Sequence, residues 1–226
     1  MPNAVKPSKV MPSKIRLYYI TDRKAFPGDE ATRRKHLLDK IAEAATAAVD
    51  YIQLREKDLS AGELEKLARE AVRIVRAGQT PTKILINSRT DIAMAVGADG
   101  VHLPADDISP REVESIRTAA RQAPANFLIS VSCHSVEDVR RAELDGASFA
   151  VLAPIFEKAA TSTAPLGLQV LKHACDGKLP VFALGGVTLE NAEPCRDAGA
   201  TGIAGIRLFQ NNNIKTMVGW VNNLGG

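Results

Sequence analysis

The chain has 226 residues, of which 45% are hydrophobic, 24% are charged and 4% are aromatic. This composition excludes a disordered or fibrous chain and predicts one ordinary domain with a sizeable core. No uncharged apolar run approaches the roughly 18–20 residues that cross a bilayer, so we expect no integral membrane protein. The formal net charge is +3, but residues 1–16 carry four cations and no acid, and subtracting these leaves −1 for the remainder. A nucleic-acid partner is therefore not expected.

Residues 1–16 are predicted to form a flexible basic arm. They contain three prolines and several lysines, but no apolar segment of the length that a signal peptide requires. The three cysteines, Cys133, Cys175 and Cys195, are odd in number and lack the close C-x-x-C pairing of a redox or zinc motif. We therefore expect a protein of the reducing cytoplasm.

From residue 17 onward, short apolar runs rich in β-formers alternate with longer stretches of helical periodicity. This alternation is typical of a parallel sheet with crossover helices. Strands are predicted at 17–21, 51–54, 83–86, 100–102, 127–131, 149–152, 181–184 and 202–204. Helices are predicted at 31–48, 61–77, 89–96, 110–121, 136–145, 166–174, 188–198 and 214–223.

A near-repeat supports this count of eight units. Gly97, Gly146 and Gly199 each follow a predicted helix and lead into a strand, with spacings of 49 and 53 residues. Two βα units per interval correspond to a quarter of a (β/α)₈ barrel. A doubly wound open sheet is the alternative, but it usually has a glycine-rich turn after the first strand, where this chain has Thr21-Asp22-Arg23. We predict an α/β fold, a single (β/α)₈ TIM barrel over residues 17–226.

In such a barrel the active site lies at the carboxyl ends of the strands. The second predicted strand leads into Arg55 and Lys57, which share the parity of Gln53, so a strand would point all three side chains the same way. Two cations on one side suit an anion, and a glutamine can hydrogen-bond a heterocycle. Spacing alone supports equally well that both cations pair with nearby acids: Glu56, Asp58 or Asp99.

Glycines follow the seventh and eighth predicted strands, at Gly185-Gly186 and at Gly205. The corresponding loops of many barrels bind a phosphate through backbone N–H groups, and this interpretation is favoured for the glycines. Arg207 would add positive charge there, although it could equally be a rim arginine with a surface partner.

Two further groups could carry chemistry. Asp106 and Asp107 could hold Mg²⁺, or they could be acids that favour the start of the following helix. His134 is placed where a general acid or base would be useful, or it is a structural hydrogen-bond donor. Asn87 and Ser132 can form hydrogen bonds, but nothing in their own chemistry identifies a role.

Together these motifs resemble the thiamine phosphate synthase and TenI superfamily over most of residues 17–209. The similar segments, in order, are 19–23, 53–57, 86–87, 97–103, 131–134 and 183–187. The resemblance implies a (β/α)₈ barrel and a transferase that joins hydroxymethylpyrimidine diphosphate to a thiazole phosphate, releasing pyrophosphate. Its partners would be these small phosphorylated molecules, and the sequence leaves open whether the barrel forms a homo-oligomer.

The resemblance also implies roles for particular residues. Gln53 would contact the pyrimidine, Ser132 the pyrimidine or its diphosphate, and Asp107 would be one Mg²⁺ ligand. The diphosphate of the pyrimidine substrate would bind Arg55, Lys57 and Asn87. The thiazole phosphate would bind Gly185, Gly186, Ile206 and Arg207. The residues expected to carry catalysis are Lys57, Ser132 and His134, chiefly by neutralising the leaving group.

The chain departs from the synthase pattern at three places. Ser88 stands where the family usually has an aspartate that is the other Mg²⁺ ligand, and Arg207 stands where a serine is common. The loop 154–165 lacks the usual Thr-x-Thr-Lys, for which Lys158 or residues 161–163 could substitute. Two alternatives therefore stay open: a TenI-like thiazole tautomerase, with His134 central, and a non-catalytic protein that binds thiazole or thiamine phosphate.

Overall fold

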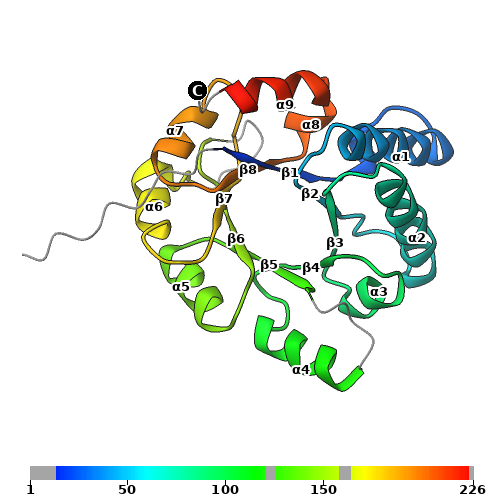
Figure 1. The fold of residues 1–226 in the computed structure, drawn as a ribbon, viewed down its shortest axis with the longest axis horizontal. Coiled ribbons are helices and arrows are strands. Elements are labelled where there is room, and N and C mark those ends of the chain that lie inside the picture. Colours follow the sequence, from blue (N-terminus) through cyan, green and yellow to red (C-terminus); the bar gives the residue numbers. More distant parts are fainter. Residues whose placement is uncertain (1–13, 121–125, 158–163, 224–226) are drawn as a thin grey trace, which may run out of the picture.

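The structure is a computed structural model that describes residues 14–120, 126–157 and 164–223. Eight parallel strands close into a barrel in the order of the chain, as Figure 1 shows. The strands are β1 (Arg16–Ile20), β2 (Tyr51–Leu54), β3 (Lys83–Asn87), β4 (Gly100–Leu103), β5 (Leu128–Cys133), β6 (Phe149–Leu152), β7 (Val181–Ala183) and β8 (Gly202–Gly205). The predicted (β/α)₈ TIM barrel is confirmed.

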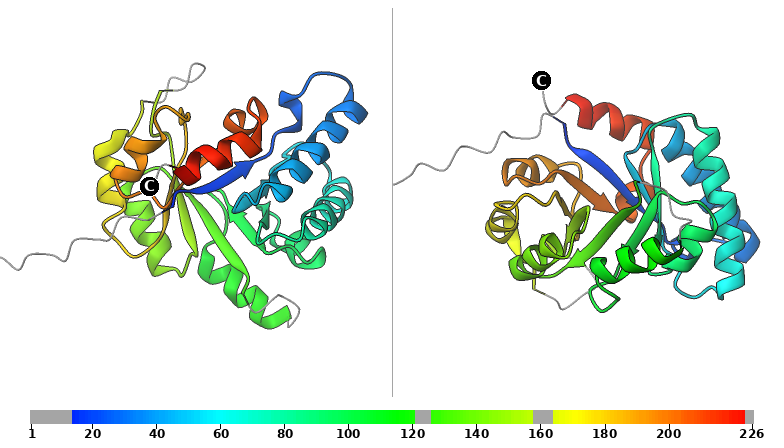
Figure 2. Two further views of the ribbon diagram at one scale, coloured as in Figure 1. Left: turned by 45° about the horizontal axis from the view of Figure 1, so that its top comes forward. Right: turned by 60° about the horizontal axis from the view of Figure 1, so that its bottom comes forward.

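Helices form an outer ring around the strands, which the side views of Figure 2 also show. They are η1 (Arg23–Ala25), α1 (Glu30–Thr46), α2 (Ala61–Ala77), α3 (Thr90–Ala95), α4 (Pro110–Ala120), α5 (Val136–Leu144), α6 (Gly167–Ala174), α7 (Ala192–Asp197), α8 (Arg207–Gln210) and α9 (Ile214–Asn223). Among the described residues, no helix is long and apolar enough to cross a membrane.

Local chemistry sets the ends of these helices. Ser60 accepts a hydrogen bond from the backbone of Glu63, whose side chain bonds back to Ser60, and this capping box starts α2. From there Leu64, Leu67 and Ala71 fall on one helical face and are buried against the barrel. The helix therefore packs against β3 and fixes where the loop after β2 must end.

Two predicted boundaries were wrong, and one helix was missed. The arm does not extend to residue 16, because Ile15 is 1% exposed and Arg16 begins β1. The helix predicted at 188–198 begins only at Ala192, because Asn191 uses its side chain to bond the backbone of Thr188 and Gly186. The four-residue helix α8 was not predicted, since it is too short to show a period.

The strands bury two separate cores, one between barrel and helices and one inside the barrel. Inside, an aromatic plug is formed by Tyr18, Tyr51, Phe149 and Phe182, whose neighbouring rings lie 4.8–5.9 Å apart. At Gly202 a Cβ would lie 2.3 Å from the Phe182 ring, so only glycine leaves room for the plug. Each plug residue lies two positions before a residue that lines the cavity described next: Ile20, Gln53, Val151 and Leu184.

Candidate functional site

A cavity of about 370 Å³ opens at the carboxyl ends of the strands, above the aromatic plug. Strand parity explains its lining, because alternate residues point inward. The layer after the plug places the polar Gln53 beside the apolar side chains of Ile20, Val151 and Leu184. The structure brings seven of the predicted site residues together there: Gln53, Arg55, Lys57, Asn87, Ser132, His134 and Ile206. Asp106 also lines this cavity.

Gln53 and Asn87 form a polar pair on the adjacent strands β2 and β3. Gln53 is 1% exposed, and its Nε2 donates a hydrogen bond to Asn87 Oδ1 at 3.3 Å. That bond fixes the orientation of both amides, so the Gln53 carbonyl oxygen remains as an acceptor and the Asn87 amide as a donor. The pair can therefore recognise a ligand that carries both a donor and an acceptor.

Arg55 and Lys57 lie in the loop just beyond β2, and both side chains line the cavity. Within the described part of the chain neither has an ion-pair partner, since the three acids considered from the sequence pair elsewhere. Glu56 bonds Arg23, Asp58 bonds Arg23 and Lys24, and Asp99 bonds Arg76 and Lys83. The interpretation that the two cations serve a structural ion pair is therefore wrong.

A buried network beneath this loop holds it in place. Thr21 Oγ1 donates to Glu56 Oε1 at 2.6 Å and accepts from the backbone N–H of Arg55 at 2.9 Å. Arg23 Nη1 lies 3.1 Å from Glu56 Oε2, and the same guanidinium donates two hydrogen bonds to Asp58. Burial raises the pKa of Glu56, and the Arg23 guanidinium lowers the pKa of Asp58. The sequence analysis noted Thr21 and Arg23 only as a turn and missed this role.

A second cavity of about 370 Å³ adjoins the first and shares Lys57, Asn87, Pro104 and Asp106 with it. Ser88 lines this second cavity in the left-handed region at φ 64°, and its Oγ donates to Asp107 Oδ2 at 2.5 Å. The serine that replaces the usual aspartate thus touches the other expected metal ligand.

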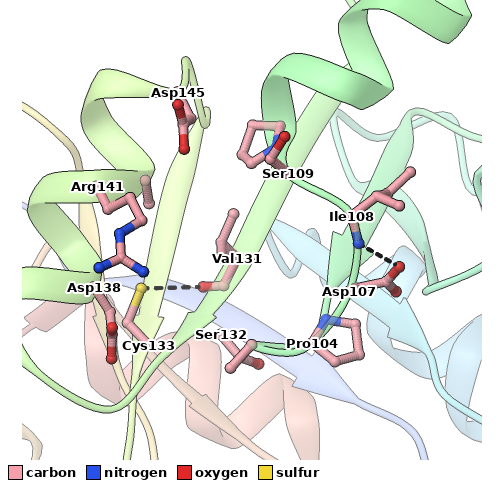
Figure 3. A pocket seen from close by; sticks show the side chains of 13 residues that line it. Pro104, Asp107, Ile108, Ser109, Val131, Ser132, Cys133, Asp138, Arg141 and Asp145 are labelled. Carbon is pink, nitrogen blue, oxygen red and sulfur yellow. Dashed lines mark hydrogen bonds between the residues drawn. The ribbon is translucent and has the colours of Figure 1, made fainter.

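Asp107 itself does not line the main cavity. It lines a smaller one of about 210 Å³ between the loop after β4 and helix α5, shown in Figure 3. There Asp107 Oδ1 accepts the backbone N–H of Ile108 at 2.8 Å, and Asp138 and Arg141 stand on the opposite wall. Among the described residues no cluster of three or more His, Cys, Asp or Glu could hold a metal.

His134 lies just beyond β5, on the wall of the main cavity. Its Nδ1 is 2.8 Å from the carbonyl oxygen of Ala153. A carbonyl can only accept, so Nδ1 carries the hydrogen and Nε2 of the neutral ring is an acceptor. Nε2 has no hydrogen-bond partner within residues 14–120, 126–157 and 164–223 and can accept a hydrogen bond.

Ser132 and His102 share a hydrogen bond on neighbouring strands. Ser132 Oγ is 2.9 Å from His102 Nε2, and His102 Nδ1 is 2.9 Å from Ser130 Oγ. The sequence analysis gave His102 no role, although its place at the end of β4 was a signal that could have found it.

The two glycines after β7 adopt backbone conformations that favour glycine. Gly185 and Gly186 have φ of 93° and 66°, and a Cβ on Gly186 would lie 2.5 Å from the carbonyl oxygen of Glu157. Neither they nor the exposed Arg207 line the main cavity, but their neighbours Leu184 and Ile206 do. Lys158 and residues 161–163 lie outside the described residues.

A closed eight-stranded barrel with a polar, cation-lined cavity at the carboxyl ends of its strands is the architecture of the TIM-barrel enzymes. A family model described as "Thiamine monophosphate synthase" matches residues 17–209. The chain therefore belongs to the thiamine monophosphate synthase family.

Individual relatives agree with this assignment. A protein of Aquifex aeolicus, provisionally named a thiamine-phosphate synthase, is 40% identical over 196 residues, which cover 86% of this chain and 97% of that protein. The thiamine-phosphate synthase of Coprothermobacter proteolyticus is 34% identical over 84% of this chain and 85% of that protein. The solved thiamine phosphate pyrophosphorylase of Pyrococcus furiosus superposes with a TM-score of 0.76 at 25% identity, covering 96% of this chain and 98% of that one.

Proposed function

We propose that this protein is a transferase of thiamine biosynthesis that joins hydroxymethylpyrimidine diphosphate to a thiazole phosphate. The observation that carries the proposal is the pair of cations, Arg55 and Lys57, which line the cavity without an ion-pair partner in the described part of the chain. Arg55 is half-buried and Lys57 is exposed, so both can offer charge-assisted hydrogen bonds to an anion in the cavity. A diphosphate supplies that anion.

The reaction breaks the bond between the pyrimidine methylene carbon and a diphosphate oxygen, and pyrophosphate leaves with the electron pair. The thiazole nitrogen then bonds to the same carbon. The main demand on the protein is to stabilise charge on the leaving group, which Arg55 and Lys57 do from the loop after β2. The Gln53 and Asn87 pair orients the ring, because its fixed donor and acceptor match a heterocycle.

The chemistry of Ser88, which lines the second cavity, and of Asp107, which lines the smaller cavity, is compatible with Mg²⁺. The Asp107 carboxylate and the Ser88 hydroxyl are hard oxygen donors in contact with each other. Mg²⁺ commonly takes one or two carboxylates and completes its shell with water and substrate phosphates, so one carboxylate is sufficient when a diphosphate is bound. An ion held there would neutralise charge on the departing pyrophosphate.

For the thiazole phosphate we propose the loops after β7 and β8. The N–H groups of Gly185 and Gly186 have no hydrogen-bond partner among the described residues. Ile206 lies on the cavity wall, and the adjacent Arg207 supplies a positive charge. In this proposal the phosphate binds at the loops after β7 and β8, and only β1 separates β8 from β2, whose loop carries the two cations.

The direct test is to incubate the protein with both substrates and Mg²⁺ and to measure pyrophosphate release. Lys57→Ala should lower kcat/KM at least about tenfold, because it removes a charge-assisted contact to the diphosphate. Lys66→Ala, an exposed lysine on α2, is the matched control and should leave the rate unchanged. Absence of pyrophosphate release by the unaltered protein would contradict the synthase proposal.

The geometry of His134 favours a tautomerase as the second candidate. His134 lies on the cavity wall, its Nδ1 donates to Ala153, and its Nε2 has no partner among the described residues and can accept a proton from a ligand. Isomerisation of thiazole carboxylate phosphate without Mg²⁺, lost in His134→Ala but kept in His173→Ala, would establish that activity. Saturable binding of thiamine phosphate with neither reaction would leave a binding protein. Cys133, Cys175 and Cys195 are buried and form no disulfide in the described part of the chain, which supports a reducing compartment such as the cytoplasm.

A further inference from the structure

His102 is a buried imidazole with a hydroxyl on each nitrogen. It is 4% exposed, and Ser130 Oγ and Ser132 Oγ lie 2.9 Å from Nδ1 and Nε2 respectively. The ring of Tyr18 packs beside it, with centroids 6.2 Å apart. Ser130 is fully buried, whereas Ser132 lines the ligand cavity. His102 thus connects the sealed interior of the barrel to the site.

The ring is neutral. Burial, with a smaller contribution from the nearby Arg55, lowers the pKa of His102 to about 3. A neutral imidazole has one N–H donor and one acceptor nitrogen. Of the two serines, therefore, one donates to His102 and the other accepts from it.

The burial of Ser130 determines which serine donates. In the described part of the chain its hydroxyl lies 2.9 Å from His102 Nδ1 and also interacts with the buried hydroxyl of Tyr18, which has no other hydrogen-bond partner there. The Tyr18 hydrogen can therefore be accepted only by Ser130 Oγ, which leaves the hydrogen of Ser130 for His102. A buried hydroxyl hydrogen without an acceptor costs about 1–3 kcal/mol, so Ser130 donates to Nδ1. The ring proton is then on Nε2 and is donated to Ser132 Oγ. The opposite tautomer would turn the Ser130 hydrogen toward Tyr18, leave the Tyr18 hydrogen unsatisfied and use the Ser132 hydrogen on the imidazole.

We infer that His102 is a positioning residue: as the Nε2–H tautomer it turns the hydroxyl hydrogen of Ser132 into the cavity, toward a hydrogen-bond acceptor of the substrate. The identity of that substrate rests on the proposed function, in which the pyrimidine ring nitrogens and the diphosphate oxygens are acceptors. The two histidines of the site then hold opposite tautomers, Nε2–H in His102 and Nδ1–H in His134.

The tautomer can be measured without any substrate, by NMR of the full chain labelled with ¹⁵N-histidine. The His102 signals are identified by their loss in His102→Gln. We expect the Nε2–H tautomer with no titration between pH 5 and pH 8, whereas an Nδ1–H tautomer or an imidazolium at pH 7 would overturn the inference. This measurement stays decisive even if the proposed reaction is not observed.

Kinetics test the action on the substrate. His102→Leu removes the donor to Ser132 and should raise KM for the pyrimidine diphosphate about tenfold with a smaller change in kcat. His102→Gln offers an amide N–H near the position of Nε2 and should restore KM to within about threefold. In a Ser132→Ala background, neither substitution should have a further effect.

Ser130→Ala provides a variant that keeps the imidazole and touches no ligand. It should raise KM in the unaltered background and not in the Ser132→Ala background. Equal losses in both backgrounds, for Ser130→Ala or for His102→Leu, would mean that the residues support only the fold, and would refute the positioning role. Thermal denaturation of each variant identifies any that fail to fold, in which case His102→Gln and Ser130→Ala carry the test.

Discussion

Replacing Arg23 with methionine tests whether the buried ion pair beneath the second-strand loop stabilises the barrel. Arg23 and Glu56 are 3% and 5% exposed, and their nearest charged atoms are 3.1 Å apart. Methionine keeps much of the aliphatic stem but leaves the Glu56 carboxylate buried without its cation. Breaking a buried pair from one side costs about 3–5 kcal/mol. We expect the free energy of unfolding, measured by urea denaturation, to fall by about that amount.

Arg69→Met is the matched control, because the side chains of Arg69 and its partner Glu65 on α2 are 56% and 42% exposed. Such surface pairs contribute less than about 1 kcal/mol. Adding Glu56→Gln to Arg23→Met should recover part of the loss, since an amide needs no counterion. Equal losses from Arg23→Met and Arg69→Met, or a further loss on adding Glu56→Gln, would refute the reasoning.

The stability lost in Arg23→Met should depend on pH, because Glu56, the partner of Arg23, is a titrating group. Burial already raises the pKa of Glu56, and the substitution removes the cation that opposes this rise. A carboxyl with a raised pKa binds protons more tightly in the folded state, so stability increases as the pH falls through that pKa. The deficit of Arg23→Met should therefore shrink from pH 8 to pH 5. A stability deficit that grows from pH 8 to pH 5 would contradict the role given to Glu56. Asp58 does not account for a change in this range, because its pKa is lowered and it titrates below pH 5.

Three further substitutions have defined outcomes. Ser88→Asp should lower the Mg²⁺ concentration needed for half-maximal synthase rate, because it adds a second carboxylate ligand; an unchanged requirement would count against the metal site. Gly186→Ala should lower stability by at least about 1 kcal/mol and weaken thiazole phosphate binding in a titration, because of its φ of 66° and the clash at its Cβ. Phe149→Ala should cost about 3–5 kcal/mol in urea denaturation, whereas Leu144→Ala, 79% exposed, should cost under about 0.5 kcal/mol.

The barrel could be predicted from the sequence because its signal is periodic and repeated. Each β-rich run followed by a helical stretch is local information, and eight of them restrict the topology strongly. Element ends were less predictable where a side chain takes over the bonding of the backbone. Asn191 shortens α7 in this way, and nothing in its immediate sequence distinguishes it from an ordinary helix residue.

The cavity residues were predictable where parity alone decides the direction of a side chain. Gln53, Arg55 and Lys57 share parity and do meet in one cavity. The contacts that support them depend instead on which strand lies beside which and in what register. Arg23 meets Glu56 across 33 residues, and His102 meets Ser130 because β4 and β5 pair in that register. Such contacts follow from the closed barrel and not from any short segment of sequence.

The aromatic plug has a consequence for the order of events during turnover. Because it closes the barrel beneath the cavity, every molecule that enters must leave by the same doorway at the carboxyl ends of the strands. A newly arriving substrate must then pass through the same opening as the departing product. The rate of product release through this opening therefore sets an upper limit on turnover.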